Sequence, residues 1–478
     1  MSAKNYKPTI GLEIHAELKT RTKMFCDSKN DPDETKPNVN VCPICMGHPG
    51  TLPVINKEAV RHVIRVGVAV GGKIADFTEF DRKNYFYPDI PKGYQISQYK
   101  FPLVSGGELN GVLLTRVHLE EDTASSTHDT GDSASSADKF SLVDFNRAGV
   151  PLMELVTEPV IHSAEQAGNF ARELQLLLRY LGVSDANMEK GEMRVEANIS
   201  VSASKEFGTK VEVKNLNSFK AVERAIDYEV KRHIEILEKG EKISQETRGW
   251  DEDKGKTFSQ RQKEDSHDYR YFPDPDLPKL KISEIPEFAE KTIKKGLPEP
   301  PWDKRKRYAK DFGLKDADIH IYVSNPGLAK HFESVADTLN LPAGEAGKKD
   351  LVALASNYII SNDAAKISAD NLVKIILMID KGELSSRGAK DVIEKLFEKD
   401  GDARKIAEEN NLLQVSDTSA LEKIAEKIIS ANQNVVADFK NGKAAAFQFL
   451  VGQGMKETKG SANPKVISDV LKKILDKK

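Results

Sequence analysis

The segment Gly11-Leu-Glu-Ile-His-Ala-Glu-Leu18 alternates apolar and polar residues. Successive side chains of a β-strand point to opposite faces, so this segment predicts a strand with Glu13, His15 and Glu17 on one face. The opposite face is apolar and consists of Leu12, Ile14, Ala16 and Leu18. Carboxylates beside an imidazole on a rigid strand can hold a divalent cation. A solvated edge strand shows the same alternation, and the octapeptide alone favours that simpler interpretation.

The composition is that of a soluble globular protein. The chain has 478 residues, of which 39% are hydrophobic and 30% charged, and this length predicts roughly two to four domains. The first residues form no apolar leader, and no run approaches the roughly 18 apolar residues of a membrane span. We therefore expect a cytoplasmic protein that does not associate with a membrane.

The net charge of −3 argues against uniform binding of nucleic acid, but the C-terminal segment is locally basic. From Ala431 to Lys478 there are nine lysines and four acidic residues, which gives a local charge of +5. Such a segment either binds phosphates or forms the solvated face of a small helical module.

The three cysteines lie close together, at Cys26, Cys42 and Cys45, and are too few for a disulfide framework. A Cys-x-x-Cys pair beside a third cysteine suggests zinc, whose structural sites take four ligands. Only three thiols are present, and the nearby candidates for a fourth ligand are Asp27, Ser28 and His48. The alternative is a group of reduced, partly buried thiols without a metal.

Two amphipathic helices are predicted among short β-like runs in the first half of the chain. One follows the capping box from Ser163 to Gln166 and ends at Gly182; the other follows Ser218 and ends at Gly240. Each should cover one face of a sheet, which predicts an α+β fold.

Prolines in Gly296-Leu-Pro-Glu-Pro-Pro-Trp302 mark a linker, after which the sequence has helical spacing with a further break near Lys399 to Asp402. Between Thr123 and Lys139 the chain consists mainly of Ser, Ala, Thr and Asp, with one Gly. This composition predicts a loop that is either a flap beside a site or a surface insertion.

One carboxylate is the strongest sign of a metal site. Glu154 lies within an otherwise apolar run, where an unpaired carboxylate is costly to bury. Glu120 and Glu121 follow another β-like segment. We expect Glu154 and one of these two residues to join Glu13 and His15 around one cation. Magnesium fits this oxygen-rich set and would present phosphates for transfer.

A second group of residues is basic and aromatic. Arg82 and Lys83 lie among tyrosines, phenylalanines and prolines, a setting that suits phosphate and the end of an RNA strand as well as it suits a structural loop. Arg194 and Asn198 lie at period 2 on a predicted strand, whose face either binds a polar ligand or is an exposed, charge-paired surface. No Gly-rich phosphate loop of the Walker type is present.

Six longer strings occur in one order along essentially the whole chain. They are Gly11 to Leu18, Asp81-Arg-Lys-Asn-Tyr-Phe-Tyr-Pro-Asp89, His118-Leu-Glu-Glu-Asp122, Val211-Glu-Val-Lys-Asn-Leu-Asn-Ser218, Asp268-Tyr-Arg-Tyr-Phe-Pro273 and Phe449-Leu-Val-Gly-Gln453. Together they resemble the B subunits of tRNA-dependent amidotransferases, enzymes that convert Glu-tRNA(Gln) or Asp-tRNA(Asn) into the correct aminoacyl-tRNA.

The resemblance implies an architecture and a reaction. It implies a cradle-shaped catalytic domain with a mixed or antiparallel sheet over 1–297, a helical domain over 298–408 and a small helical tail over 409–478 that contacts tRNA. ATP, with magnesium, would phosphorylate the side-chain carboxylate of the mischarged amino acid. Ammonia released from glutamine by an amidase-like A subunit would then displace the phosphate, and a small C subunit would brace the pair.

The resemblance also implies roles for single residues. The positions that match the metal and kinase site are Glu13, His15, Glu121 and Glu154, with Glu120 adjacent. Lys83 would neutralise a transferred phosphate, and Glu121 could also take a proton from ammonium at a tunnel mouth. Further nucleotide contacts are expected from Arg82, Arg194 and Asn198.

The chain departs from the resemblance at one point. Zinc-carrying members have Cys-x-Cys before the Cys-x-x-Cys, whereas this chain has Cys26-Asp27-Ser28. The expected four-thiolate site is therefore incomplete, and the site is either completed by another ligand or empty. The alternative for the whole protein is a tRNA-binding scaffold that has lost catalysis.

Overall fold

The structure is a computed structural model that describes residues 5–128, 141–262, 269–339, 348–414, 418–440, 442–458 and 462–476. The chain divides into two compact units, Met1–Pro301 and Trp302–Lys478, and the division falls in the predicted proline-rich linker. Most of the predicted loop between Thr123 and Lys139 lies outside the described residues, as do Asp268 and the lysines at 459, 477 and 478.

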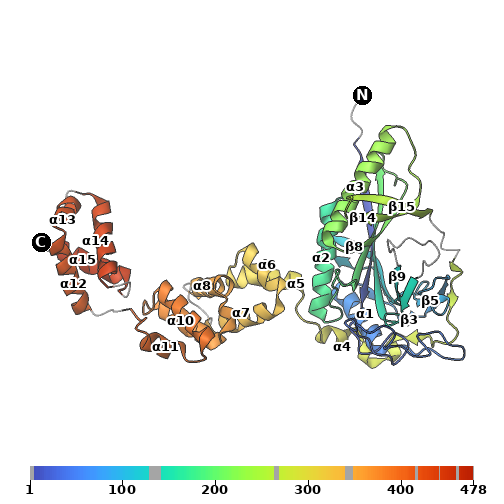
Figure 1. The fold of residues 1–478 in the computed structure, drawn as a ribbon, viewed down its shortest axis with the longest axis horizontal. Coiled ribbons are helices and arrows are strands. Elements are labelled where there is room, and N and C mark those ends of the chain that lie inside the picture. Colours follow the sequence, from blue (N-terminus) through green and yellow to red (C-terminus); the bar gives the residue numbers. More distant parts are fainter. Residues whose placement is uncertain are drawn as a thin grey trace, which may run out of the picture. The chain divides into compact units, whose positions relative to one another are not determined.

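The first unit is built on one large sheet, which has thirteen strands among the described residues. Its main path runs through β15 (Lys256–Gln262), β14 (Glu246–Asp251), β13 (Val211–Leu216), β12 (Met193–Ser202), β1 (Lys7–Glu17), β11 (Pro151–Thr157), β8 (Val112–Glu121), β5 (Tyr94–Ser97), β4 (Asp81–Asn84) and β16 (Phe272–Pro273) (Figure 1). β13 and β14 pair in parallel, and the other pairs on this path are antiparallel. The sheet is therefore mixed, and the predicted α+β class is confirmed.

Short strands extend this framework. β2 (Lys73–Ile74) pairs with β6 (Val104–Ser105), and both β6 and β7 (Glu108–Leu109) pair with β8. Two further pairs form separate ladders. They are β9 (Ser125–His128) with β10 (Ser141–Asp144), and β3 (Phe77–Thr78) with β17 (Leu280–Lys281).

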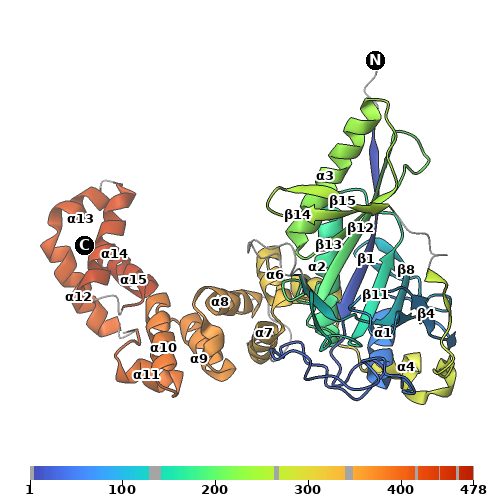
Figure 2. The same cartoon turned by 45° about the vertical axis from the view of Figure 1, so that its right-hand side comes forward.

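Helices α1 (Lys57–Ala69), α2 (Ala164–Leu181) and α3 (Phe219–Glu238) belong to the first unit, and α2 and α3 lie along the same face of the sheet (Figures 1 and 2). The predicted N-caps form, because the hydroxyl of Ser163 accepts a hydrogen bond from the Gln166 amide and that of Ser218 from the Ala221 amide. The chain leaves α2 at Gly182, whose φ of 65° favours glycine. A short helix, α4 (Glu290–Lys295), precedes the linker.

β1 lies in the middle of the sheet, between β12 and β11. Leu12, Ile14 and Ala16 are at most 1% exposed and fill the core on one face of the strand. The polar residues that alternate with them point to the other face. The edge strand that the octapeptide alone favoured is therefore a wrong prediction. The polar side chains lie at the centre of the sheet face opposite this core, which is called the open face below.

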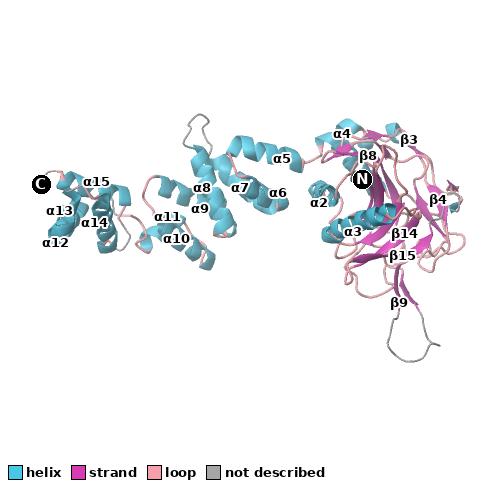
Figure 3. Ribbon diagram, turned by 90° about the horizontal axis from the view of Figure 1, so that it is seen from above, coloured by secondary structure: helices cyan, strands magenta, loops and turns pink. Residues whose placement is uncertain are grey.

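The second unit is helical throughout its named elements, as predicted, whereas the named strands all belong to the first unit (Figure 3). Its helices are α5 (Pro301–Arg307), α6 (Asp316–Ser324), α7 (Pro326–Leu339), α8 (Lys348–Ser361), α9 (Ala369–Asp380), α10 (Ser386–Glu398), α11 (Ala403–Glu409), α12 (Thr418–Ala431), α13 (Gln433–Lys440), α14 (Ala444–Glu457) and α15 (Pro464–Leu475). The finer division into 298–408 and 409–478 stays a prediction. None of the described helices is long and apolar enough to cross a membrane.

Candidate functional site

A row of polar side chains crosses four neighbouring strands on the open face of the sheet. His15 of β1 lies directly opposite Arg194 of β12 and Glu154 of β11, and Glu154 in turn lies opposite His118 of β8. Side chains directly opposite each other in antiparallel strands come close enough to interact. The register therefore assembles residues that are far apart in the sequence.

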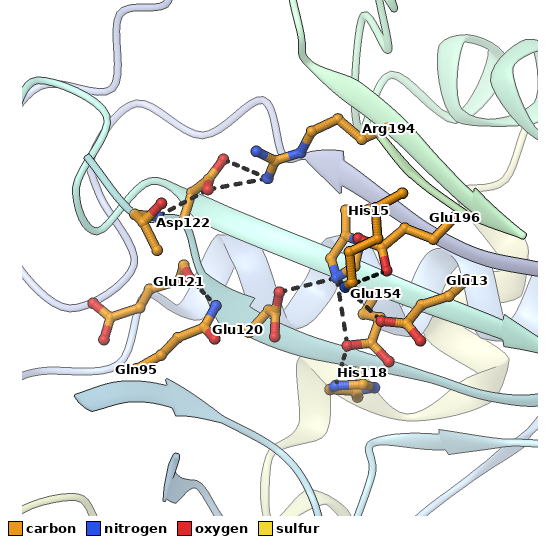
Figure 4. Close-up of polar contacts among 12 residues, drawn as sticks. Glu13, His15, Gln95, His118, Glu120, Glu121, Asp122, Glu154, Arg194 and Glu196 are labelled. Atoms are coloured by element: carbon orange, nitrogen blue, oxygen red, sulfur yellow. Dashed lines mark hydrogen bonds and ion pairs between the residues drawn. The ribbon is translucent and has the colours of Figure 1, made fainter. Parts of the chain in front are cut away.

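The imidazole of His15 is the centre of this group (Figure 4). Its Nε2 lies 3.4 Å from a carboxylate oxygen of Glu120, 3.5 Å from one of Glu154 and 3.8 Å from one of Glu13. The side chains of Glu120 and Glu154 are 4% and 9% exposed, and that of Glu13 is 27% exposed. Three carboxylates thus converge on one histidine at the floor of the open face.

The crowding of these carboxylates shifts their proton affinities. Burial, together with the charge of Glu154, raises the pKa of Glu13 and of Glu120 to about 7. Burial opposes the charged form of His15, but the hydrogen bond to Glu154 and the surrounding carboxylates outweigh it and raise the pKa of His15 to about 9. Burial also opposes ionisation of Glu154, yet His118, His15 and Arg116 hold its pKa well below the usual value.

This donor set fits magnesium. Ligand atoms of Glu13, His15 and Glu154 lie within 4.8 Å of one another, as do those of His118, Glu120 and Glu154. Hard cations prefer carboxylate oxygens, and a bound dication would favour the ionised forms that burial and mutual repulsion oppose. The set therefore gains from a cation at neutral pH.

The structure brings Glu120, and not Glu121, to His15. The two residues are consecutive on β8, so their side chains point to opposite faces, and Figure 4 shows the carboxylate of Glu121 directed away from the cluster. Glu121 instead accepts a hydrogen bond from Lys92 at 2.6 Å and one from the Ile96 amide at 2.9 Å. The expected placement of Glu121 among the metal ligands is corrected accordingly.

Lys83, on β4, is held by aromatic rings. Its Nζ lies 5.0 Å from the ring centre of Tyr269 and 5.7 Å from that of Tyr85. Burial opposes its charge, but Tyr271 and Glu120 outweigh burial and raise the pKa of Lys83. A charged ammonium is therefore fixed close to the carboxylate cluster, where an incoming anion would meet it.

The other three residues predicted to contact a nucleotide differ in their partners within the chain. Arg82 pairs with Asp274 at 2.7 Å and Asp276 at 2.8 Å, and thereby ties β4 to the chain after β16. Arg194 contacts both oxygens of Asp122 at 3.0 Å (Figure 4). The Oδ1 atom of Asn198 is buried and accepts no hydrogen bond from the described residues. Their roles toward a nucleotide stay predictions, and the geometry of Arg82 favours a structural role.

Two residues of this site were not predicted as functional. Arg116 donates to Glu154 at 3.1 Å, and Nε2 of His118 lies 3.5 Å from the same carboxylate. Burial opposes the charged form of His118 and lowers its pKa to about 4. Period-2 spacing provided a signal, because Arg116, His118 and Glu120 share one face of a single strand.

The three cysteines do come together. The Sγ atom of Cys45 lies 3.9 Å from that of Cys42, and the three cysteine sulfurs all lie within 4.8 Å of one another. Ser28 stands where a fourth thiol would be needed, with its Oγ 3.8 Å from the sulfur of Cys45. Among the described residues, this cluster of potential metal ligands consists of the three cysteines alone. Lys23, which is fully buried, places its Nζ 3.7 Å from the same sulfur. These residues do not complete a closed, four-ligand zinc site.

A pocket of about 260 Å³ lies between Glu121 and two of the cysteines, Cys26 and Cys45. Its walls include Cys26, Cys45, Lys92, Glu121 and Arg82. Gly149 lies beside both residues and has a φ of +83°, a backbone conformation that favours glycine. The pocket therefore lies on the side of β8 opposite to the His15 cluster.

Comparison with known families agrees with this arrangement. The model of the GatB/GatE catalytic domain matches residues 8–286, and that of the GatB domain matches residues 343–475. The chain belongs to the GatB family. Every residue of the His15 cluster lies within the segment that matches the catalytic domain.

Relatives of this GatB-family chain match it over nearly its whole length. The B subunit of the aspartyl/glutamyl-tRNA(Asn/Gln) amidotransferase of Crocosphaera subtropica is 43% identical over 490 residues, and the match covers 98% of both chains. The protein of the same name from Carboxydothermus hydrogenoformans is 43% identical over 486 residues, which are 99% of this chain and all of the relative. The chain is accordingly one component of an amidotransferase, and the naming of its relatives as B subunits implies further components.

Proposed function

We propose that this chain uses ATP to phosphorylate the side-chain carboxylate of Glu-tRNA(Gln) or Asp-tRNA(Asn), and then amidates that carboxylate with ammonia from a partner subunit. The observation that carries the proposal is the convergence of Glu13, Glu120 and Glu154 on His15 beside the ammonium of Lys83. A non-catalytic scaffold for tRNA has no use for a buried acidic cluster next to a phosphate-rich ligand.

The chemistry explains why these groups are needed. A carboxylate is a poor acyl donor, and phosphorylation turns one of its oxygens into a leaving group. Magnesium bound at the cluster would neutralise charge on the phosphates. Glu120 and Glu154 orient His15 and would hold the cation, while Lys83 would stabilise negative charge on the phosphate during transfer.

Glu121 has a separate part in the proposal. It faces the pocket on the other side of β8 and is paired with Lys92 at 2.6 Å. A carboxylate in this position can accept a proton from ammonium and leave neutral ammonia, which is the nucleophilic form. We therefore assign ammonia delivery, rather than metal binding, to Glu121.

The proposal includes partners. Ammonia would come from glutamine through an amidase-like A subunit, a small C subunit would brace the assembly, and the helical tail over 409–478 would contact tRNA(Gln) or tRNA(Asn). The lysines of the tail support this last contact, since they give its segment from Ala431 a charge of +5. Deletion of the tail should weaken tRNA binding more than glutamine hydrolysis.

The decisive experiment uses the reconstituted complex with Glu154→Gln, and Glu206→Gln as a matched control on an exposed position. ATP-dependent conversion of Glu-tRNA(Gln) should be lost in the first variant and unchanged in the second, with glutamine hydrolysis preserved. For Glu121→Gln, phosphorylation should persist while amidation fails. Undiminished turnover in Glu154→Gln would leave only the scaffold function.

A further inference from the structure

We propose that Cys42 and Cys45 form a redox-active dithiol, which hydroperoxides oxidise to a disulfide, in the place where a structural zinc site would otherwise stand. The three cysteines are free thiols, and Cys42 and Cys45 are in direct contact, with their sulfurs 3.9 Å apart. The inference is independent of the proposed function, because it concerns the chemistry of the thiols alone.

The first step of the argument is the environment of the Cys45 sulfur. It accepts a hydrogen bond from the Cys42 amide at 3.2 Å and lies 3.7 Å from the ammonium of Lys23. Lys23 is fully buried, and its ammonium also donates a hydrogen bond to the carbonyl oxygen of Phe145 at 3.1 Å. Ser28, at 3.8 Å, adds a hydroxyl to the same sulfur. Several donors thus converge on one sulfur, the arrangement that makes a cysteine nucleophilic.

The second step is access. Cys45 is only 4% exposed at the molecular surface, but it lines the pocket of about 260 Å³ described above. A water molecule fills about 30 Å³ of liquid, so a small peroxide fits in this pocket beside the sulfur. Cys42 does not line the pocket and is half-buried next to Cys45. Cys26 lines the pocket as well, but the Cys42 amide and the Lys23 ammonium lie at the sulfur of Cys45. We therefore assign the reaction with peroxide to Cys45 and the resolving step to Cys42, whose sulfur is 3.9 Å away.

The reaction then has two balanced steps. The sulfur of Cys45 attacks one oxygen of hydrogen peroxide; the O–O bond breaks, and the departing hydroxide takes the thiol proton and leaves as water. This produces a sulfenic acid on Cys45. The sulfur of Cys42 attacks that of Cys45, the S–O bond breaks, and a second water leaves as the disulfide forms. The two thiols together lose two electrons, and one peroxide is reduced to two waters.

The test uses the full chain, freed of reductant and treated with hydrogen peroxide. Titration of thiols after denaturation should show that two of the three cysteines are lost, and a non-reduced peptide map should join Cys42 to Cys45. Cys26→Ser, the matched control, should still form the disulfide. Cys42→Ser should stop at the sulfenic acid of Cys45, which dimedone traps, and Cys45→Ser should leave the remaining thiols reduced.

Metal analysis separates this inference from the zinc interpretation. The chain purified from zinc-supplemented cells should carry substoichiometric zinc, whereas Ser28→Cys, which restores a fourth thiol, should gain one zinc per chain and resist peroxide. Stoichiometric zinc that protects all the thiols of the unaltered chain would overturn the proposal. A disulfide that joins Cys26 to Cys45 would also overturn it, because the contact with Cys42 would not then direct the reaction.

Discussion

Glu120→Gln should remove a pH dependence from the stability of the first unit when divalent cations are absent. Glu120 is 3% exposed, and burial raises its pKa to about 7 from the ordinary 4.5. Between these two pH values the unfolded chain has released a proton that the folded chain still holds. The carboxyl group of Glu120 therefore makes the unaltered protein lose stability as the pH rises through this range, and the loss levels off once the pH is well above the folded-state pKa.

The magnitude follows from the two pKa values. Their separation of roughly 2.5 pH units corresponds to about 3 kcal/mol of unfolding free energy at 1.36 kcal/mol per unit. Most of this change lies between pH 5 and pH 8, although the unfolded carboxyl group is already partly ionised at pH 5. The glutamine variant has no ionisable group at this position and should lack that loss.

The assay is urea unfolding in EDTA at pH 5 and pH 8, monitored by tryptophan fluorescence. The chain has two tryptophans, and Trp302 lies in the second unit, so a Trp302→Phe background leaves Trp250 as a reporter of the first unit. Between the two pH values the unaltered chain should lose on the order of 2 to 3 kcal/mol more than Glu120→Gln does. Parallel changes in both proteins would refute the reasoning, because they would show that Glu120 titrates normally in the folded state.

Three further predictions follow from the same geometry. Saturating Mg²⁺ at pH 8 should raise the urea midpoint of the unaltered chain more than that of Glu120→Gln, because a dication favours the ionised carboxylates; equal rises would contradict a cation at this cluster. Lys83→Met should slow ATP-dependent transamidation in the reconstituted complex by about 10²-fold while the urea midpoint changes little, and an unchanged rate would remove Lys83 from the reaction. Phe170→Ala, which empties a fully buried position of α2, should lower the unfolding free energy by about 3–5 kcal/mol in the Trp250 assay.

Local patterns in the sequence were sufficient for much of the fold. The caps at Ser163 and Ser218 and the spacing of apolar residues after them place α2 and α3 correctly, because these signals act within one or two turns of a helix. The proline-rich linker before Trp302 was likewise a local signal. Helical spacing predicted the second unit for the same reason.

The site required information that no local pattern carries. Alternation at His15 gives the face of β1 but not its position in the sheet, which depends on pairing with Glu154 and Arg194 far along the chain. Alternation likewise cannot choose between Glu120 and Glu121 until the facing side of β8 is known. The pairing of His118 with Glu154 fixes that side, and it therefore selects Glu120.

The central place of β1 has a consequence for how the site moves. Glu13 and His15 belong to a strand whose backbone is hydrogen-bonded on both sides, to β11 and to β12. The amide protons of such a strand exchange with solvent only when the sheet itself opens, whereas loops and edge strands open locally at much lower free energy. The floor of the site is therefore a fixed surface. Any adjustment to ligands of different length must be made by the segments above the floor.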